Sequence, residues 1–121
     1  MIDKSQFRRT ESGGKWFIDQ TVCGFEIIVP DYGGSPKDVD IAAAGHIIDN
    51  LDAISAKAVP FIKYHLTMSR EYMLGAVEVL SEPDRHGAQA LLVYHNEEDG
   101  YLWIEAGLRD DSPVYALVKY Y

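Results

Sequence analysis

The chain has 121 residues, and its 11 Lys and Arg against 19 Asp and Glu give a formal net charge of −8 at pH 7. This charge argues against binding to double-stranded nucleic acid or to an anionic membrane, because both attract proteins through cations that neutralise phosphates. Length and a hydrophobic content of 47% predict one globular domain over residues 1–121, which needs neither a disulfide nor a metal to fold.

The number of cysteines and the hydropathy pattern indicate the cellular compartment in which the protein is expected. Cys23 is the single cysteine, so an intramolecular disulfide is impossible and a cysteine-based zinc site would lack its other sulfur ligands. No apolar run is long enough for a signal-peptide core or a membrane span. We therefore expect a cytoplasmic protein in which Cys23 is a buried structural thiol within a strand.

Apolar clusters near the N-terminus predict two or three strands. The clusters cover residues 7–10, 16–19 and 22–29, and turn-forming residues separate them. Short connections favour an antiparallel meander for these strands.

A helix is predicted over residues 36–50, with Ser35 as its N-cap and Pro36 at its first position. Its apolar residues are spaced by three and four, so they form one stripe that a sheet should cover. Asp40 and Asp49 are expected to point away from that sheet. The stripe comprises Ile41, Ala44, Ile48 and Leu51.

A second helix is predicted to begin after Asp52 and to reach His65. Pro60 lies inside it and has no amide hydrogen, so we expect the helix to kink or split near Val59.

The apolar period then changes from helical to strand-like. Strands are predicted over residues 73–80, 88–95, 101–108 and 113–121, joined by short turns that favour an antiparallel meander. The whole pattern predicts an α+β fold with a mainly antiparallel sheet, the element order β-β-α-α-β-β-β-β, and two helices packed on one face.

Successive hairpins alternate between the two ends of a sheet, which gathers the acidic turns into two clusters. Each cluster could contact a cationic partner, although solvated turns are normally rich in such residues. The first end carries Glu82, Asp84, Asp110 and Asp111 together with Arg85, His86 and Arg109, and the second end carries Glu97, Glu98 and Asp99.

Strand alternation places Tyr101, Trp103 and Tyr115 on the face opposite the predicted helices. Tyr and Trp are frequent anchors of protein interfaces, because they bury a large rigid area and keep a polar tip. Alternatively, the N-terminal strands or a helix cover this face, and the aromatic residues belong to the core.

Four histidines occur, but neither an HExxH pattern nor a GxSxG pattern accompanies them, so no catalytic residue, metal site or cofactor is predicted. Two local arrangements remain open. His95 with Glu97 and Glu98 could bind a hard cation, and Asp84 with His86 could form an acid–base pair.

In its overall pattern the chain resembles the small acidic immunity proteins that bacteria encode beside polymorphic or contact-dependent growth-inhibition toxins. The shared features are a single acidic α+β domain, an aromatic and carboxylate-rich surface, and C-terminal strands that end in residues 110–121. The resemblance implies a protein that binds one cognate toxin, often a basic nuclease, and blocks its active site with acidic side chains. It implies no residue assignments, so the contacts we expect follow from the predicted geometry.

We expect the partner to contact the acidic turns and the aromatic residues of the neighbouring strands, with the chain itself a monomer or homodimer. Two other classes remain open: a small enzyme with Asp84, His86 and Arg109 in a pocket at one sheet end, and a homo-oligomeric module whose aromatic face pairs with itself. The expected contact residues are Glu82, Asp84, Asp110, Asp111, Glu97, Glu98, Asp99, Tyr101, Trp103 and Tyr115.

Overall fold

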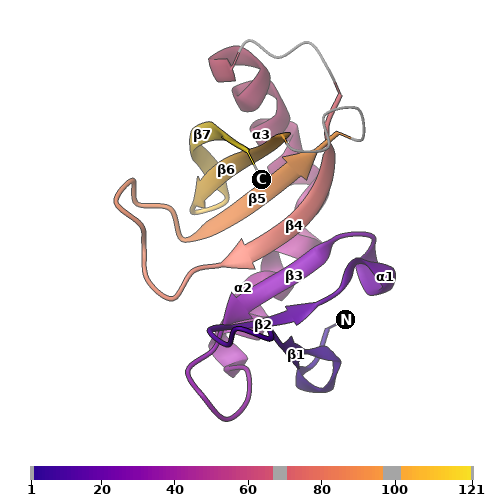
Figure 1. The fold of residues 1–121 in the computed structure, drawn as a ribbon. Coiled ribbons are helices and arrows are strands. Elements are labelled where there is room, and N and C mark those ends of the chain that lie inside the picture. Colours follow the sequence, from indigo (N-terminus) through magenta and orange to yellow (C-terminus); the bar gives the residue numbers. More distant parts are fainter. Residues whose placement is uncertain (1, 67–70, 97–101, 121) are drawn as a thin grey trace.

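A computed structural model describes residues 2–66, 71–96 and 102–120 of the chain, and Figure 1 shows its fold. The elements are a 3-10 turn η1 (Lys4–Gln6), β1 (Arg8–Arg9), β2 (Lys15–Ile18), α1 (Gln20–Cys23), β3 (Glu26–Pro30), α2 (Asp38–Asp49), α3 (Leu51–Leu66), β4 (Met73–Val79), β5 (Ala90–His95), β6 (Leu102–Arg109) and β7 (Ser112–Tyr120).

All these strands belong to one seven-stranded sheet whose spatial order follows the chain order from β1 to β7. Every neighbouring pair is antiparallel except β3 and β4, which are parallel and are connected through α2 and α3. The predicted α+β class and mainly antiparallel sheet are confirmed. The predicted element order is not, because the chain forms the additional helix α1 between β2 and β3.

The strand predicted over residues 22–29 is shorter than expected, because its first residues belong to α1. The Asp19 side chain accepts a hydrogen bond from the Thr21 amide and so caps the helix start, while Gly24, with φ at 88°, ends it. Cys23 therefore lies at the end of a helix and is only partly buried, contrary to the prediction.

The helix α2 begins at Asp38, and Lys37 rather than Ser35 is its N-cap. Its buried residues are Asp40, Ala44 and Ile47. The prediction that Asp40 points away from the sheet is therefore wrong. Position 40 lies one helical turn before Ala44, so the packing that buries Ala44 also buries this carboxyl group.

Of the two outcomes expected at Pro60, a kink or a split, the split does not occur, because α3 continues through this residue as one helix. Ile54 and Ala58 before the proline and Ile62 after it are all buried in one hydrophobic cluster. Packing on both sides of Pro60 thus holds the helix together although one backbone hydrogen bond is missing.

The core consists of two hydrophobic clusters between helices and sheet, and α2 and α3 lie behind the sheet in the view of Figure 1. The first cluster joins α3 to alternate residues of β5 and β6, and the second joins α2 to β2 and β3. Strand alternation directs the intervening side chains to the opposite surface of the sheet. We call that surface the pocket face and define it by Glu26, Ile28, Ala76, Glu78, Val93, Trp103, Glu105 and Tyr115.

Candidate functional site

The pocket face is ordered in rows that cross the sheet. The register pairs Glu26 with Ala76, Ala76 with Val93, and Val93 with Glu105, so these side chains form one row from β3 to β6. Ala76 has the smallest side chain in the row. The surface of the sheet is therefore hollowed at Ala76 on β4, between Glu26 at one end of the row and Glu105 at the other.

A cavity of about 340 Å³ occupies this dip. Ile28, Ala76 and Val93 give it an apolar floor, Trp103 forms a wall, and the remaining lining residues are Glu26 and Glu78. An apolar hollow with a few polar groups at its edge is the usual form of a binding site.

A glycine on β4 lets the wall of the pocket pack closely. A Cβ atom added to Gly75 would lie 2.6 Å from His95 Cδ2 and 3.0 Å from Trp103 Cζ3, so both rings lie against its bare backbone. The two ring centroids are 5.2 Å apart. Trp103 thus packs against both His95 and the Gly75 backbone, which fixes an aromatic surface at the pocket.

Within the described residues, one of the two carboxylates that line the pocket has a cationic partner and the other has none. Lys15 Nζ donates a hydrogen bond to Glu78 Oε2 at 2.5 Å, and that carboxylate is largely buried. Glu26, at the other edge of the same pocket, is exposed. Lys15 neutralises the negative charge of Glu78. The negative charge that the described lining of the pocket retains is therefore that of Glu26.

Beside the pocket, a tyrosine hydroxyl lies between two carboxylates. Tyr115 Oη is 3.0 Å from Glu105 Oε2 and 3.1 Å from Asp84 Oδ2. Glu105 is 7% exposed, and its other oxygen, Oε1, lies 3.0 Å from Lys119 Nζ. Burial and the two carboxylates raise the pKa of the Tyr115 hydroxyl far above its usual value, so the hydroxyl keeps its proton.

Asp84 connects this network to the turn between β4 and β5. Its Oδ1 atom accepts hydrogen bonds from the backbone amides of His86 and Ala88 at 2.9 and 3.0 Å. Burial acts to raise the pKa of Asp84, but these amides and the Tyr115 hydroxyl together lower it. The carboxylate is therefore ionised at neutral pH and stays beside the pocket face.

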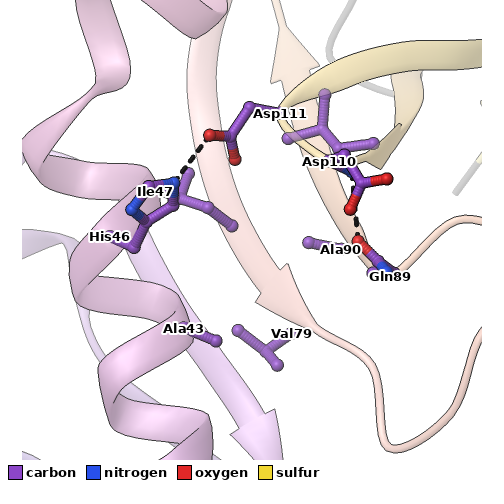
Figure 2. Close-up of a pocket in the computed structure, with 9 residues that line it drawn as sticks. Ala43, His46, Ile47, Val79, Gln89, Ala90, Asp110 and Asp111 are labelled. Carbon is purple, nitrogen blue, oxygen red and sulfur yellow. Dashed lines mark hydrogen bonds and ion pairs between the residues drawn. The ribbon is translucent and has the colours of Figure 1, made fainter.

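The turn between β6 and β7 faces α2 instead, at a separate cavity of about 180 Å³ shown in Figure 2. His46 Nε2 lies 2.6 Å from Asp111 Oδ2 across this cavity, and the Asp110 amide donates to Gln89 Oε1 at 3.1 Å. Sequence reasoning missed the pair of His46 and Asp111, because the two residues are 65 positions apart and no local pattern relates them.

The acidic residues expected at the first sheet end have different partners. Asp84 belongs to the Tyr115 network, Asp111 is paired with His46, and Glu82 is exposed in the loop before β5. The acidic cluster expected at the second end, Glu97, Glu98 and Asp99, lies outside the described residues, as does Tyr101.

The candidate enzyme residues at the first end do lie near one another. The His86 ring centroid is 5.0 Å from that of Tyr115, and the Arg109 side chain runs beside Gly87. However, Asp84 accepts from the backbone amide of His86, and the His86 ring nitrogen Nε2 accepts from Arg85 Nε at 3.3 Å. These contacts stabilise the turn and do not form the acid–base pair considered above.

Two further features concern metals and membranes. In residues 2–66, 71–96 and 102–120, no group of three or more His, Cys, Asp or Glu side chains is arranged to hold a metal ion. Within the same described ranges, every helix is too short or too polar to cross a membrane.

No family model matches the chain, and comparisons with curated proteins and with solved structures gave no significant match.

Proposed function

We propose that this chain is an immunity-type inhibitor that binds one cognate basic toxin, such as a nuclease, in the cytoplasm and blocks its active site. The observation that carries the proposal is the pocket face, where rigid aromatic rings and ionised carboxylates surround an apolar hollow. A sheet surface of this composition has the anchors and the charge that recognition of a cationic protein requires.

Preorganisation of these side chains supports a binding function. Trp103 packs on Gly75, and Tyr115 packs on Gly107, where an added Cβ atom would lie 2.1 Å from the tyrosine ring. Both rings are thus held in place before any partner arrives, so little side-chain entropy is lost on binding. Asp84 and Glu105 are held by hydrogen bonds in the same way.

The net charge of −8 supports the choice of a basic partner. A cationic cleft would be attracted from a distance by the whole chain and would then meet local carboxylates at the contact. Association with such a partner should be fast at low ionic strength and slower at high ionic strength.

The test uses the product of the reading frame next to the gene for this chain. We expect purified chain to bind that product and to suppress its toxicity on co-expression. Trp103→Ala should weaken the binding by about thirtyfold or more, because truncating a central aromatic anchor costs about 2 kcal/mol or more. Affinity should also fall as salt rises from 50 to 500 mM.

A matched variant separates the pocket face from the turn that faces α2. The double variant Asp110→Asn and Asp111→Asn removes two negative charges, as a loss of carboxylates from the pocket face would. It removes them at the cavity of Figure 2. We expect this double variant to weaken binding less than Trp103→Ala does. Normal affinity of Trp103→Ala, or full toxicity in the presence of the wild-type chain, would overturn the proposal.

A further inference from the structure

We infer that the pocket between β3 and β6 receives an arginine side chain of the partner, an inference that rests on the proposed function and specifies its central contact. The lining supplies the two features that an arginine needs, which are an apolar path for its methylene groups and a carboxylate at the end of that path. Trp103 stands at one side of the path and Glu26 at the other.

The dimensions of the sheet suit a long side chain. The Trp103 ring extends from β6 to Gly75 on β4, so about one strand spacing, about 4.8 Å, separates it from the neighbouring strand β3, which carries Glu26. A partner backbone near Trp103 would direct the arginine stem over Val93 and Ala76. The guanidinium would then reach the Glu26 carboxylate, whereas a short side chain would stop on the apolar floor.

The charges favour a single cationic group. Glu78 already has Lys15 at 2.5 Å, so among the described residues that line the pocket the Glu26 carboxylate is the one left to be neutralised. Two carboxylates line the pocket, one of them already paired with Lys15, and the described residues contain no group of three or more His, Cys, Asp or Glu side chains placed to hold a metal ion. An uncharged apolar side chain would cover Glu26 without compensating its charge, which is unfavourable.

Arginine fits this pocket better than lysine. Its planar guanidinium pairs with a carboxylate through two parallel hydrogen bonds, and it is less strongly hydrated than an ammonium group. Its planar guanidinium also stacks on aromatic faces such as that of a tryptophan ring. The carboxylate at the edge of the pocket suits the bidentate pairing of the guanidinium, and the apolar floor suits its weak hydration.

The test needs no toxin, because N-acetyl-arginine amide serves as the probe. The chain has two tryptophans, and Trp16 packs with the hydrophobic cluster on the opposite face of the sheet. In a ¹H–¹⁵N titration we expect the Trp103 indole resonance to shift in a saturable way while that of Trp16 stays unchanged. Trp103→Phe identifies the resonance.

Two controls isolate the charge. N-acetyl-citrulline amide has nearly the same shape without the positive charge and should cause at most a small shift. Glu26→Gln should weaken probe binding by about tenfold, since a hydrogen bond between charged groups contributes about 1.5 kcal/mol or more. Glu11→Gln removes an exposed carboxylate outside the pocket and should leave probe binding unchanged.

The inference is overturned if the Trp103 resonance does not respond to the arginine probe, if citrulline binds equally well, or if Glu26→Gln binds the probe as the wild type does. These results would leave the proposed inhibitor function standing, because that function is tested by toxin binding. Conversely, a saturable arginine site without toxin protection would support the pocket and refute the inhibitor.

Discussion

The Tyr115 hydroxyl lies 3.0 Å from the buried Glu105 carboxylate on the neighbouring strand. The same hydroxyl is 3.1 Å from Asp84, which belongs to the loop between β4 and β5. A hydroxyl has one hydrogen to donate, so the two carboxylates share it. Lys119 supplies Glu105 with a positive charge and makes the arrangement possible in a part of the sheet with little water.

Removing this hydroxyl should destabilise the fold. Tyr115→Phe leaves Glu105 buried with one donor fewer, and we expect the free energy of unfolding to fall by about 1–3 kcal/mol. Urea unfolding measures the change. Tyr64→Phe is the matched control, because Tyr64 is 82% exposed and its hydroxyl should contribute nothing measurable. Equal stabilities of the two variants would show that the Tyr115 contacts do not stabilise the fold.

Gly107 should tolerate no side chain. A Cβ atom there would lie 2.1 Å from the Tyr115 ring, so Gly107→Ala must displace the ring and break its hydrogen bonds. We expect a loss of about 2–3 kcal/mol in urea unfolding.

Gly45→Ala is the control for this change. Gly45 lies within α2, where an added Cβ atom meets nothing within 4 Å, so alanine should raise stability by about 0.5–1 kcal/mol. Opposite signs at the two glycines are the expected result. If Gly107→Ala is neutral, the ring of Tyr115 has other positions of equal energy.

Much of the fold could be predicted from the sequence because one face of the sheet is apolar. The strands predicted over 73–80, 88–95, 101–108 and 113–121 correspond to β4, β5, β6 and β7, where alternation is regular. The sequence also contains two local signals for α1, which are Asp19 as its N-cap and Gly24 at its end. The apolar residues around Cys23 nevertheless favour a strand when the sequence is considered alone.

The site was harder to predict, because it depends on contacts between distant strands. The charge of Glu78 is balanced by Lys15, and this pairing exists only because the α2–α3 crossover places β3 beside β4. Likewise, Asp111 contacts His46 on α2 because of the direction that the β6–β7 turn takes, and it does not join Asp84. Such pairings follow from topology and not from any local spacing.

The β6–β7 turn contains backbone strain that a glycine should relieve. Asp110 and Asp111 have φ angles of 50° and 65°, in the left-handed region that favours glycine. Asp110→Gly keeps the backbone amide that donates to Gln89, so we expect it to stabilise the chain by about 0.5–1 kcal/mol. Thermal and urea unfolding measure the change.

Asp110→Ala separates strain from charge at the same position. It removes the same carboxylate but keeps a Cβ atom, so it should be about 1 kcal/mol less stable than Asp110→Gly. Equal stability of the alanine and glycine variants would mean that any gain comes from charge alone.

Asp40 should make stability depend on pH. Its carboxyl group is 7% exposed, and within the described residues Oδ2 has no hydrogen-bond partner, so burial raises its pKa above 3.8 even though Lys37 lowers it somewhat. A carboxyl group whose pKa is higher in the folded state binds more protons when folded. It therefore costs stability above its folded pKa, and that cost disappears as pH falls below its unfolded pKa.

Asp40→Asn should consequently be more stable than the wild type at pH 7, by on the order of 1 kcal/mol. In urea unfolding the difference should stay constant well above the folded pKa and shrink as the pH falls through it toward 3.8, because the wild-type carboxyl becomes neutral. Asp38→Asn is the control in the same helical turn: its exposed carboxylate interacts with Lys4 and with the helix N-terminus, so asparagine should be slightly destabilising at pH 7. A pH-independent difference for Asp40→Asn would show that the burial of this carboxyl group carries no cost.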